Sequence, residues 1–279
     1  MKYYKKKNEI IIDGKEDFNP KHILECGQIF RFEKNVVGNY VVYSKDYAAE
    51  IEDTKSGYII KTDAVDYFEN FFNLKVDYGM IKNEISKLSP IIEDAVNNAS
   101  GLRILKGDLF EVLVSFIISA NNNIKRIKLI INKICERLGE WKGEYFAFPT
   151  PEAFGGVDEE FFKSIGAGYR APYLAEVKTA YNLLIKEDLD AMTDIELRKR
   201  LMEIKGVGPK VADCIMLFAF NRKRVFPVDV WMERVYYEYF GKKKFTRLQI
   251  AEYLKDMFHD NAGYVQQYLF YSKTVKNEN

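Results

Sequence analysis

The chain has 279 residues, of which 47% are hydrophobic and 30% are charged, and its net charge is only +1. This composition can bury a sizeable core in one or two domains and excludes a disordered tail. The three cysteines, Cys26, Cys135 and Cys214, lack Cys-x-x-Cys spacing, which argues against a disulfide framework or a zinc site. Their number also excludes a four-cysteine iron–sulfur cluster.

The N-terminus and the apolar runs bear on where the protein works. The first residues, Met1–Lys7, lack the apolar core of a signal peptide, and no apolar run approaches the length that crosses a membrane. We therefore expect a cytoplasmic protein with no membrane partner.

Short runs of β-forming residues, separated by turns, occupy the first 62 residues. The turns contain Gly and Asn, as in Asn35–Asn39 and Thr54–Gly57. This pattern predicts an antiparallel sheet accompanied by a helix or two. The expected strands are Glu9–Ile12, Ile29–Phe32, Tyr40–Tyr43, Ala48–Ile51 and Tyr58–Lys61.

From Tyr67 onward the apolar residues recur with helical spacing, and after Asp108 we expect one helix after another. We therefore predict an α+β protein, in which a small N-terminal antiparallel β-sheet domain of residues 1–97 packs on a larger all-α domain of residues 98–279. The expected helices are 108–120, 124–138, 171–186, 193–203, 209–220, 229–240, 246–258 and 262–273.

The segment Ile204–Cys214 places two glycines just before a predicted helix. Gly206 and Gly208 allow positive φ and leave no Cβ in the path of an approaching strand of nucleic acid. Backbone N–H groups near the helix start can then hold a phosphate without reading a base. Pro209 suits the first helical turn. By itself, a Gly-x-Gly turn is more often an ordinary αα-hairpin that closes a helical core.

Lys210 and Asp229 add candidate chemistry to this hairpin. Lys210 and Cys214 are four residues apart in an apolar run, so they share one face of a helix where an amine is poorly hydrated. A neutral amine can attack an electrophilic carbon, as in Schiff-base enzymes. Asp229 precedes another predicted helix as a natural N-cap, and an ionised carboxylate there can face positive charge on a sugar. The simpler interpretations are a solvated surface lysine and a plain helix cap.

The hairpin, Lys210 and the distant Asp229 together resemble the helix-hairpin-helix DNA glycosylases. Further segments narrow the resemblance to the 8-oxoguanine DNA glycosylases and extend it over nearly the whole chain. The hairpin is shared by many repair proteins, whereas the Gly-Gln-x-Phe-Arg and triple-asparagine motifs are more specific. The matching segments are Gly27–Arg31, Ser115–Arg126, Gly168–Tyr173 and Ala262–Phe270.

The resemblance implies a pocket for a flipped 8-oxoguanine. The carbonyl of Gly27 would accept a hydrogen bond from N7–H of the lesion, and Gln266 would read its Watson–Crick edge. Phe270 and Cys214 would sandwich the ring, and Phe218 and Pro227 would complete the pocket. Without the resemblance, Gly27 would be interpreted as a turn, Gln266 as a surface amide and Phe270 as a core aromatic.

The resemblance also implies a grip on duplex DNA. Asn121 would fill the space of the extruded base, and Arg126 and Arg170 would read the opposite cytosine. Tyr169 would insert as a wedge into the stack of DNA bases. The remaining candidate DNA-binding residues are Gly206, Gly208, Val211 and Trp231. Trp231 departs from the family, which often has a histidine at this position. Phe218 and Phe32 also differ from the residues that the family usually has at their positions.

By resemblance, catalysis uses the amine of Lys210 as nucleophile and the carboxylate of Asp229 to stabilise the cationic sugar. A Schiff base then forms and β-elimination nicks the strand, so neither a cofactor nor a catalytic metal is needed. The family can hold a structural cation on hairpin carbonyls, here those of Met202, Ile204 and Val207. We expect a monomer that acts on double-stranded DNA. The alternatives are a non-catalytic hairpin DNA-binding protein and a monofunctional glycosylase for another damaged base.

Charge is distributed unevenly along the chain. Residues 1–97 carry 14 Lys and Arg against 17 Asp and Glu, whereas residues 98–279 carry 28 against 24. We therefore expect the DNA footprint on the second part. Arg222, Lys223 and Arg224 are candidate phosphate contacts, and the preferred interpretation of residues 242–244, all lysine, is a solvated loop.

Overall fold

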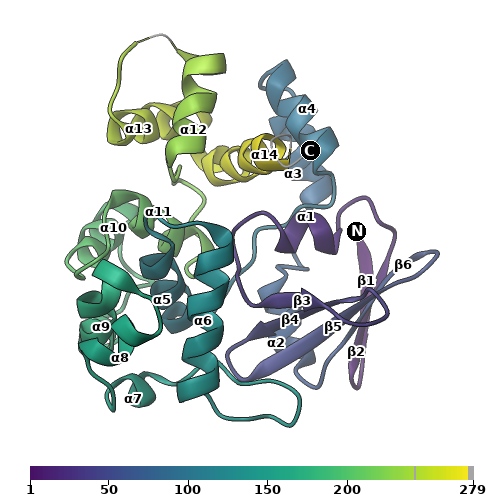
Figure 1. The fold of residues 1–279 in the computed structure, drawn as a ribbon. Helices are drawn as coiled ribbons and strands as arrows, with labels where there is room; N and C mark the ends of the chain where they lie inside the picture. The colour runs from purple at the N-terminus through teal and green to yellow at the C-terminus, as the bar shows by residue number, and fades with distance from the viewer. Residues whose placement is uncertain (242, 276–279) are drawn as a thin grey trace.

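The computed structural model describes residues 1–241 and 243–275, so one member of the lysine triplet, Lys242, lies outside the described residues. Figure 1 shows a twisted sheet beside one group of helices, α5 to α11. A second group, α12 to α14 with α3 and α4, lies above both. The predicted α+β class, with a β-sheet domain packed on a helical domain, is confirmed.

The sheet is antiparallel throughout, and its strand order is β1-β2-β6-β5-β4-β3. Alternate side chains such as Ile10, Ile12 and Ile60 point into a core that helix α2 covers, because successive residues of a strand face opposite sides. The elements of this part are β1 Lys2–Lys6, β2 Glu9–Asp13, α1 Pro20–Leu24, β3 Phe32–Lys34, β4 Tyr40–Ser44, β5 Tyr47–Asp53, β6 Gly57–Lys61 and α2 Val65–Phe71.

The strand predictions differ from the structure at two places. The strand expected at Ile29–Phe32 is wrong, since β3 begins only at Phe32. The preceding residues leave the sheet because Arg31 lies in the domain interface, 3.3 Å from Glu111 and hydrogen-bonded to the carbonyl of Phe146. The lysine-rich edge strand β1 was not anticipated, because four of its five side chains are exposed and leave almost no apolar alternation.

All eight predicted helices are present, and most ends lie within two residues of the expected positions. The exception is the helix expected at 229–240, which changes after α12 into a π-helical turn, Tyr236–Phe240. The helices are α3 Tyr78–Ile85, α4 Pro90–Asn98, α5 Leu109–Ser119, α6 Ile124–Leu138, α7 Pro151–Phe154, α8 Glu159–Ser164, α9 Ala171–Leu184, α10 Asp194–Met202, α11 Pro209–Phe218, α12 Val230–Val235, α13 Arg247–Phe258 and α14 Ala262–Val275.

Buried polar side chains join the sheet to the helices. Gln28 donates to the carbonyls of Ile23 and Arg103 and accepts from the backbone N–H of Leu105. Helix α4 packs against α14, and side chains of α3 and α4 belong to the helical core. The domain boundary after residue 97 stays a prediction. None of the helices in the described part of the chain combines the length and the apolar character that crossing a bilayer requires.

Two residues of the basic run before Asp229, Arg222 and Lys223, have polar partners within the protein. Arg222 donates to the carbonyls of Asp190 and Met192, and the amine of Lys223 contacts the side chain of Asn221 and lies 5.2 Å from the ring centroid of Tyr264. The expectation of phosphate contacts is therefore not supported at Arg222 and Lys223, because their side-chain nitrogens bind the protein itself.

Lys223 is expected to destabilise the fold at neutral pH. Burial lowers the pKa of its amine to about 7, and the charge of Lys106 acts in the same direction. An unfolded chain keeps this proton up to the ordinary value of 10.5, so stability should rise with pH between these two values. We expect Lys223→Met to raise the free energy of unfolding at pH 6 by about 2 kcal/mol, with the gain fading toward pH 10.

Urea denaturation at pH 6 and pH 10 measures this effect. Arg224→Met is the matched control, because Arg224 is exposed and only ion-paired with the exposed Asp260. Its stability should stay within about 0.5 kcal/mol of the unmodified protein. A Lys223→Met protein that is no more stable than the control at pH 6 would contradict the assignment.

Candidate active site

The turn between α10 and α11 has the tight geometry expected of its glycines. Gly206 has a φ of +88°, and a Cβ there would lie 2.8 Å from the ring of Tyr173. Gly206 therefore uses the positive φ that glycine allows. Gly208 does not, since its φ is −90° and it is the N-cap of α11. A Cβ on Gly208 would meet no atom within 4 Å, so the helix start is open on that side.

Lys210 stands in the first turn of α11 against an aromatic wall. It is half-buried, and its Nζ lies 5.3 Å from the ring centroid of Phe116 on α5. Cys214, one turn further along, is buried, and burial raises the pKa of its thiol to about 11 against the lowering effect of the Lys210 charge. The amine therefore sits beside an uncharged thiol and a benzene ring rather than in a shell of carboxylates.

Asp229 is the N-cap of α12, as predicted. Its Oδ1 accepts hydrogen bonds from the backbone N–H groups of Trp231 and Met232 at 2.9 and 3.0 Å. Both bonds use the same oxygen, so the cap does not occupy Oδ2. The helix N-terminus also favours the negative charge of this carboxylate.

Lys210 and Asp229 line one open cavity of about 720 Å³. Asn121, at the end of α5, lies on the same cavity and has a left-handed φ of +49°, which is uncommon outside glycine. Among the described residues no ion pair joins Lys210 to Asp229. The predicted residues that share this cavity are Asn121, Lys210, Val211, Asp229 and Trp231.

The residues predicted to hold the lesion form a second group beside the sheet. Gly27 has a φ of +76°, and a Cβ there would lie 3.4 Å from the ring of Phe270. One turn earlier on α14, Gln266 is buried and its Nε2 donates to the carbonyl of Pro227 at 3.2 Å. The structure thus brings these four residues together across three segments that are distant in the chain.

An aromatic cluster lies against the lysine. Phe218 and Phe116 are stacked with ring centroids 5.3 Å apart and an interplanar angle of 19°, and Phe30 contacts Phe116 edge-on at 5.8 Å. Phe116 was missed as a site residue. Its motif could have suggested it, but its contact with Lys210 depends on how α5 packs on α11.

The residues predicted to read the opposite strand surround the turn after α5. Arg170 is buried and donates to the carbonyls of Ala120, Asn121 and Ala167, while the hydroxyl of Tyr169 also donates to Ala120. Arg126 is exposed and donates to the carbonyl of Gly166 at 3.0 Å. In this conformation Arg170 therefore holds the backbone next to Asn121.

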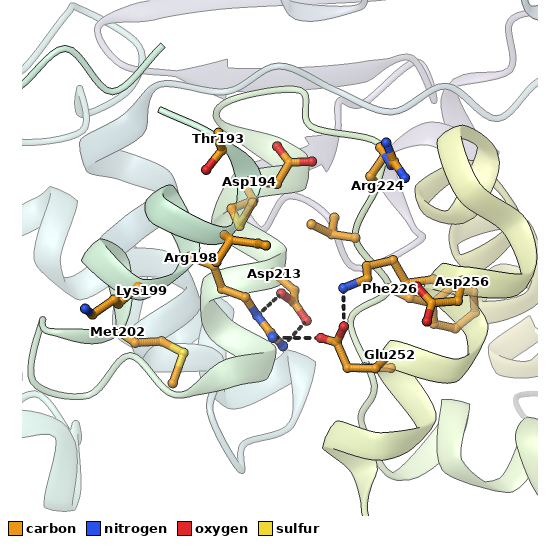
Figure 2. A pocket seen from close by; sticks show the side chains of 15 residues that line it. Thr193, Asp194, Arg198, Lys199, Met202, Asp213, Arg224, Phe226, Glu252 and Asp256 are labelled. Carbon is orange, nitrogen blue, oxygen red and sulfur yellow. Dashed lines mark hydrogen bonds and ion pairs between the residues drawn. The ribbon is translucent and has the colours of Figure 1, made fainter. Parts of the chain in front are cut away.

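An ion-pair network that sequence reasoning missed lines one side of the cavity that contains Lys210 and Asp229. Arg198 of α10 lies 2.8 Å from Asp213 of α11, at an angle too poor for a hydrogen bond through Nε, and 2.9 Å from Glu252 of α13. Burial raises the pKa of Asp213 to about 6, opposed by Arg198. Figure 2 shows this network across a second cavity of about 790 Å³, which shares Arg198 and Asp213 with the first.

Comparisons with known proteins show the family of this chain. Residues 10–113 match the 8-oxoguanine DNA glycosylase N-terminal domain, and residues 114–259 match the HhH-GPD superfamily of base excision DNA repair proteins. The probable N-glycosylase/DNA lyase of Methanothermobacter thermautotrophicus is 33% identical over 238 residues, which are 74% of this chain and 76% of that protein. This chain belongs to the 8-oxoguanine DNA glycosylase family.

Other members of the 8-oxoguanine DNA glycosylase family support the assignment. The Clostridium acetobutylicum 8-oxoguanine glycosylase/lyase, solved with double-stranded DNA containing cytosine opposite 8-oxoG, has a TM-score of 0.92 and 36% identity, and the match covers 99% of each chain. The N-glycosylase/DNA lyase OGG1 of Arabidopsis thaliana is 31% identical over 218 residues, 72% of this chain and 60% of that protein. The resemblance deduced from the sequence motifs is confirmed.

Proposed function

We propose that this protein is a base-excision repair enzyme that removes 8-oxoguanine from double-stranded DNA and then nicks the strand. One observation carries the proposal: the amine of Lys210 and the carboxylate of Asp229 line the same cavity at the mouth of the hairpin. A nucleophile without the carboxylate, or a cap without the amine, would suit simple DNA binding. The pair suits cleavage of a glycosidic bond.

Recognition requires that the damaged nucleotide leaves the stack, because C1′ of a stacked base cannot be reached. Oxidation at C8 converts N7 of guanine from an acceptor into a donor. The carbonyl of Gly27, fixed by a turn that only glycine readily adopts, then accepts from the lesion and repels normal guanine. Such a contact contributes about 1 to 3 kcal/mol, so it supplies only part of the discrimination.

The chemistry proceeds through a covalent intermediate. The lone pair of Lys210 Nζ forms a bond with C1′ while the bond to the base breaks and its electrons leave with the base. The adduct loses a proton and opens to a Schiff base, and loss of a C2′ proton then expels the 3′ phosphate. Asp229 offsets the positive charge that develops on the sugar before the new bond is complete.

Residues on and near the cavity can also contact the intact strand opposite the lesion. Asn121 lies on the cavity beside Lys210 and can fill the space that the extruded nucleotide leaves. Arg126, near the start of α6, is exposed and carries donors for a cytosine edge. We infer a preference for cytosine opposite the lesion, action as a monomer, and work in the cytoplasm without a membrane partner.

The test is single-turnover excision from duplexes that carry 8-oxoguanine opposite each of the four bases. We expect release of the lesion and strand nicking, fastest opposite cytosine, and no release from the matched guanine duplex. Binding without base release would favour a non-catalytic hairpin protein. Base release without nicking would favour a monofunctional glycosylase.

Arg126→Ala is the second arm of this experiment. Because Arg126 supplies base-edge donors, its loss should lower the preference for cytosine by about tenfold, with little change in the rate on the least favoured duplex. Lys125→Ala, next to it on the exposed start of α6, is the matched control. Equal cleavage opposite all four bases by the unmodified protein would refute the inferred preference.

A further inference from the structure

We propose that Gln267 is a positioning residue that acts together with the carbonyl of Pro227 to fix the direction of the Gln266 amide, and so makes the lesion pocket select purines with a guanine-type edge. The inference rests on the function proposed above, and it assigns a role to a residue that no motif singled out. Its basis is a line of buried hydrogen bonds from Pro227 through Gln266 to Gln267.

The first of the two constraints on this amide comes from Pro227. A carbonyl can only accept a hydrogen bond, so the end of the Gln266 amide that faces it at 3.2 Å must be the Nε2 group. The opposite orientation would place two acceptor oxygens against each other in a buried site. The Oε1 atom of Gln266 therefore points toward the neighbouring side chain.

Gln267 completes the line with a donor. Its Nε2 lies 2.7 Å from Gln266 Oε1, and both side chains are 3% exposed. Its own Oε1 is buried and has no hydrogen-bond partner among the described residues. A buried acceptor without a donor is unfavourable, and an apolar side chain of the same length would avoid that cost. The amide therefore contributes through its donor rather than through packing.

Gln266 is positioned so that its amide can contact a base in the pocket. It lies four residues before Phe270, so the two share one face of α14, and the ring of Phe270 packs against Gly27. Pro227 uses one N–H of Gln266 and Gln267 uses one lone pair of its oxygen. One donor and one acceptor remain, in an order that cannot reverse without breaking both bonds.

A fixed order of donor and acceptor distinguishes two classes of purine. The guanine edge presents an acceptor at O6 and donors at N1 and N2, whereas the adenine edge presents a donor at N6 and an acceptor at N1. A freely rotating amide can pair with either edge by turning over, but a fixed one pairs with only one. 8-Oxoadenine shares the N7–H and C8 carbonyl of 8-oxoguanine, so the two lesions differ at this edge alone.

The experiment compares single-turnover excision of 8-oxoguanine and 8-oxoadenine, each opposite cytosine. Gln267→Met keeps the length of the side chain and removes the donor. We expect the ratio of the two rates to fall about tenfold, the effect of one lost hydrogen bond. Borohydride trapping on an abasic duplex should be unchanged, because no base is read there. A native ratio in a folded Gln267→Met protein would overturn the proposal.

Gln267→Glu supplies a readout that a packing role would not move. A buried carboxyl group has a raised pKa, so it is protonated at low pH and donates its O–H to Gln266. We expect a near-native ratio at pH 5.5 and a ratio about tenfold lower at pH 8.5, while the unmodified protein shows a constant ratio. A pH-independent ratio in the Glu variant would overturn the inference. If the unmodified protein traps on abasic DNA but releases no 8-oxoguanine, the proposed function fails instead.

Discussion

Lys210→Gln should abolish covalent trapping by borohydride on an 8-oxoguanine duplex. The trapped species is a reduced Schiff base, and a glutamine amide has no basic lone pair that could form one. Excision of the base should fall by roughly ten-thousandfold, because the nucleophile is lost while the pocket and the hairpin remain. Glutamine is one atom shorter than lysine, but its methylene groups can still pack beside Phe116, so the protein should fold.

Lys205→Gln is the matched control for this substitution. Lys205 lies on the same hairpin, is exposed, and pairs with Glu176 at 2.8 Å on the surface. Its trapping yield and excision rate should stay within about twofold of the unmodified protein. Duplex affinity should also be nearly unchanged in Lys210→Gln. Undiminished trapping in that variant would place the nucleophile elsewhere and remove the basis of the proposed mechanism.

Parts of the fold that depend on neighbouring residues could be predicted. Pro209 at the first position of α11 and Asp229 as the N-cap of α12 are local signals, because helix starts need a residue that satisfies or lacks the free N–H groups. Gly206 belongs to the same class, since a tight turn demands its positive φ. These positions were therefore interpreted correctly from the chain alone.

Features that depend on contacts between distant residues could not be predicted from the sequence. Arg31 leaves the sheet because it pairs with Glu111. These two residues are eighty positions apart in the chain, so no local pattern reveals the pair. The contact between Phe116 and Lys210 and the network around Arg198 likewise join helices that are far apart in the chain. Gln267 resembles an ordinary helix amide until its neighbour's bond to Pro227 is known. Candidate site residues could thus be named from the sequence, whereas the contacts that support them required the fold.

Asp229→Asn separates the two roles of the aspartate. Asparagine is as good an N-cap as aspartate, so its Oδ1 can keep both bonds to Trp231 and Met232 and α12 should remain intact. The negative charge that faces the developing sugar cation is lost. We therefore expect the thermal midpoint to change little and the excision rate to fall about a hundredfold, the usual loss when one fixed electrostatic partner of a transition state is removed.

Asp229→Ala completes the comparison, because it removes the cap together with the charge. Its excision rate should match that of Asp229→Asn, while its free energy of unfolding should be about 1 kcal/mol lower. Single-turnover kinetics and urea denaturation of the three proteins therefore resolve charge from capping. An Asn variant as fast as the unmodified protein would make Asp229 a structural cap only, and Lys210 would then have to act without a carboxylate on the cavity wall.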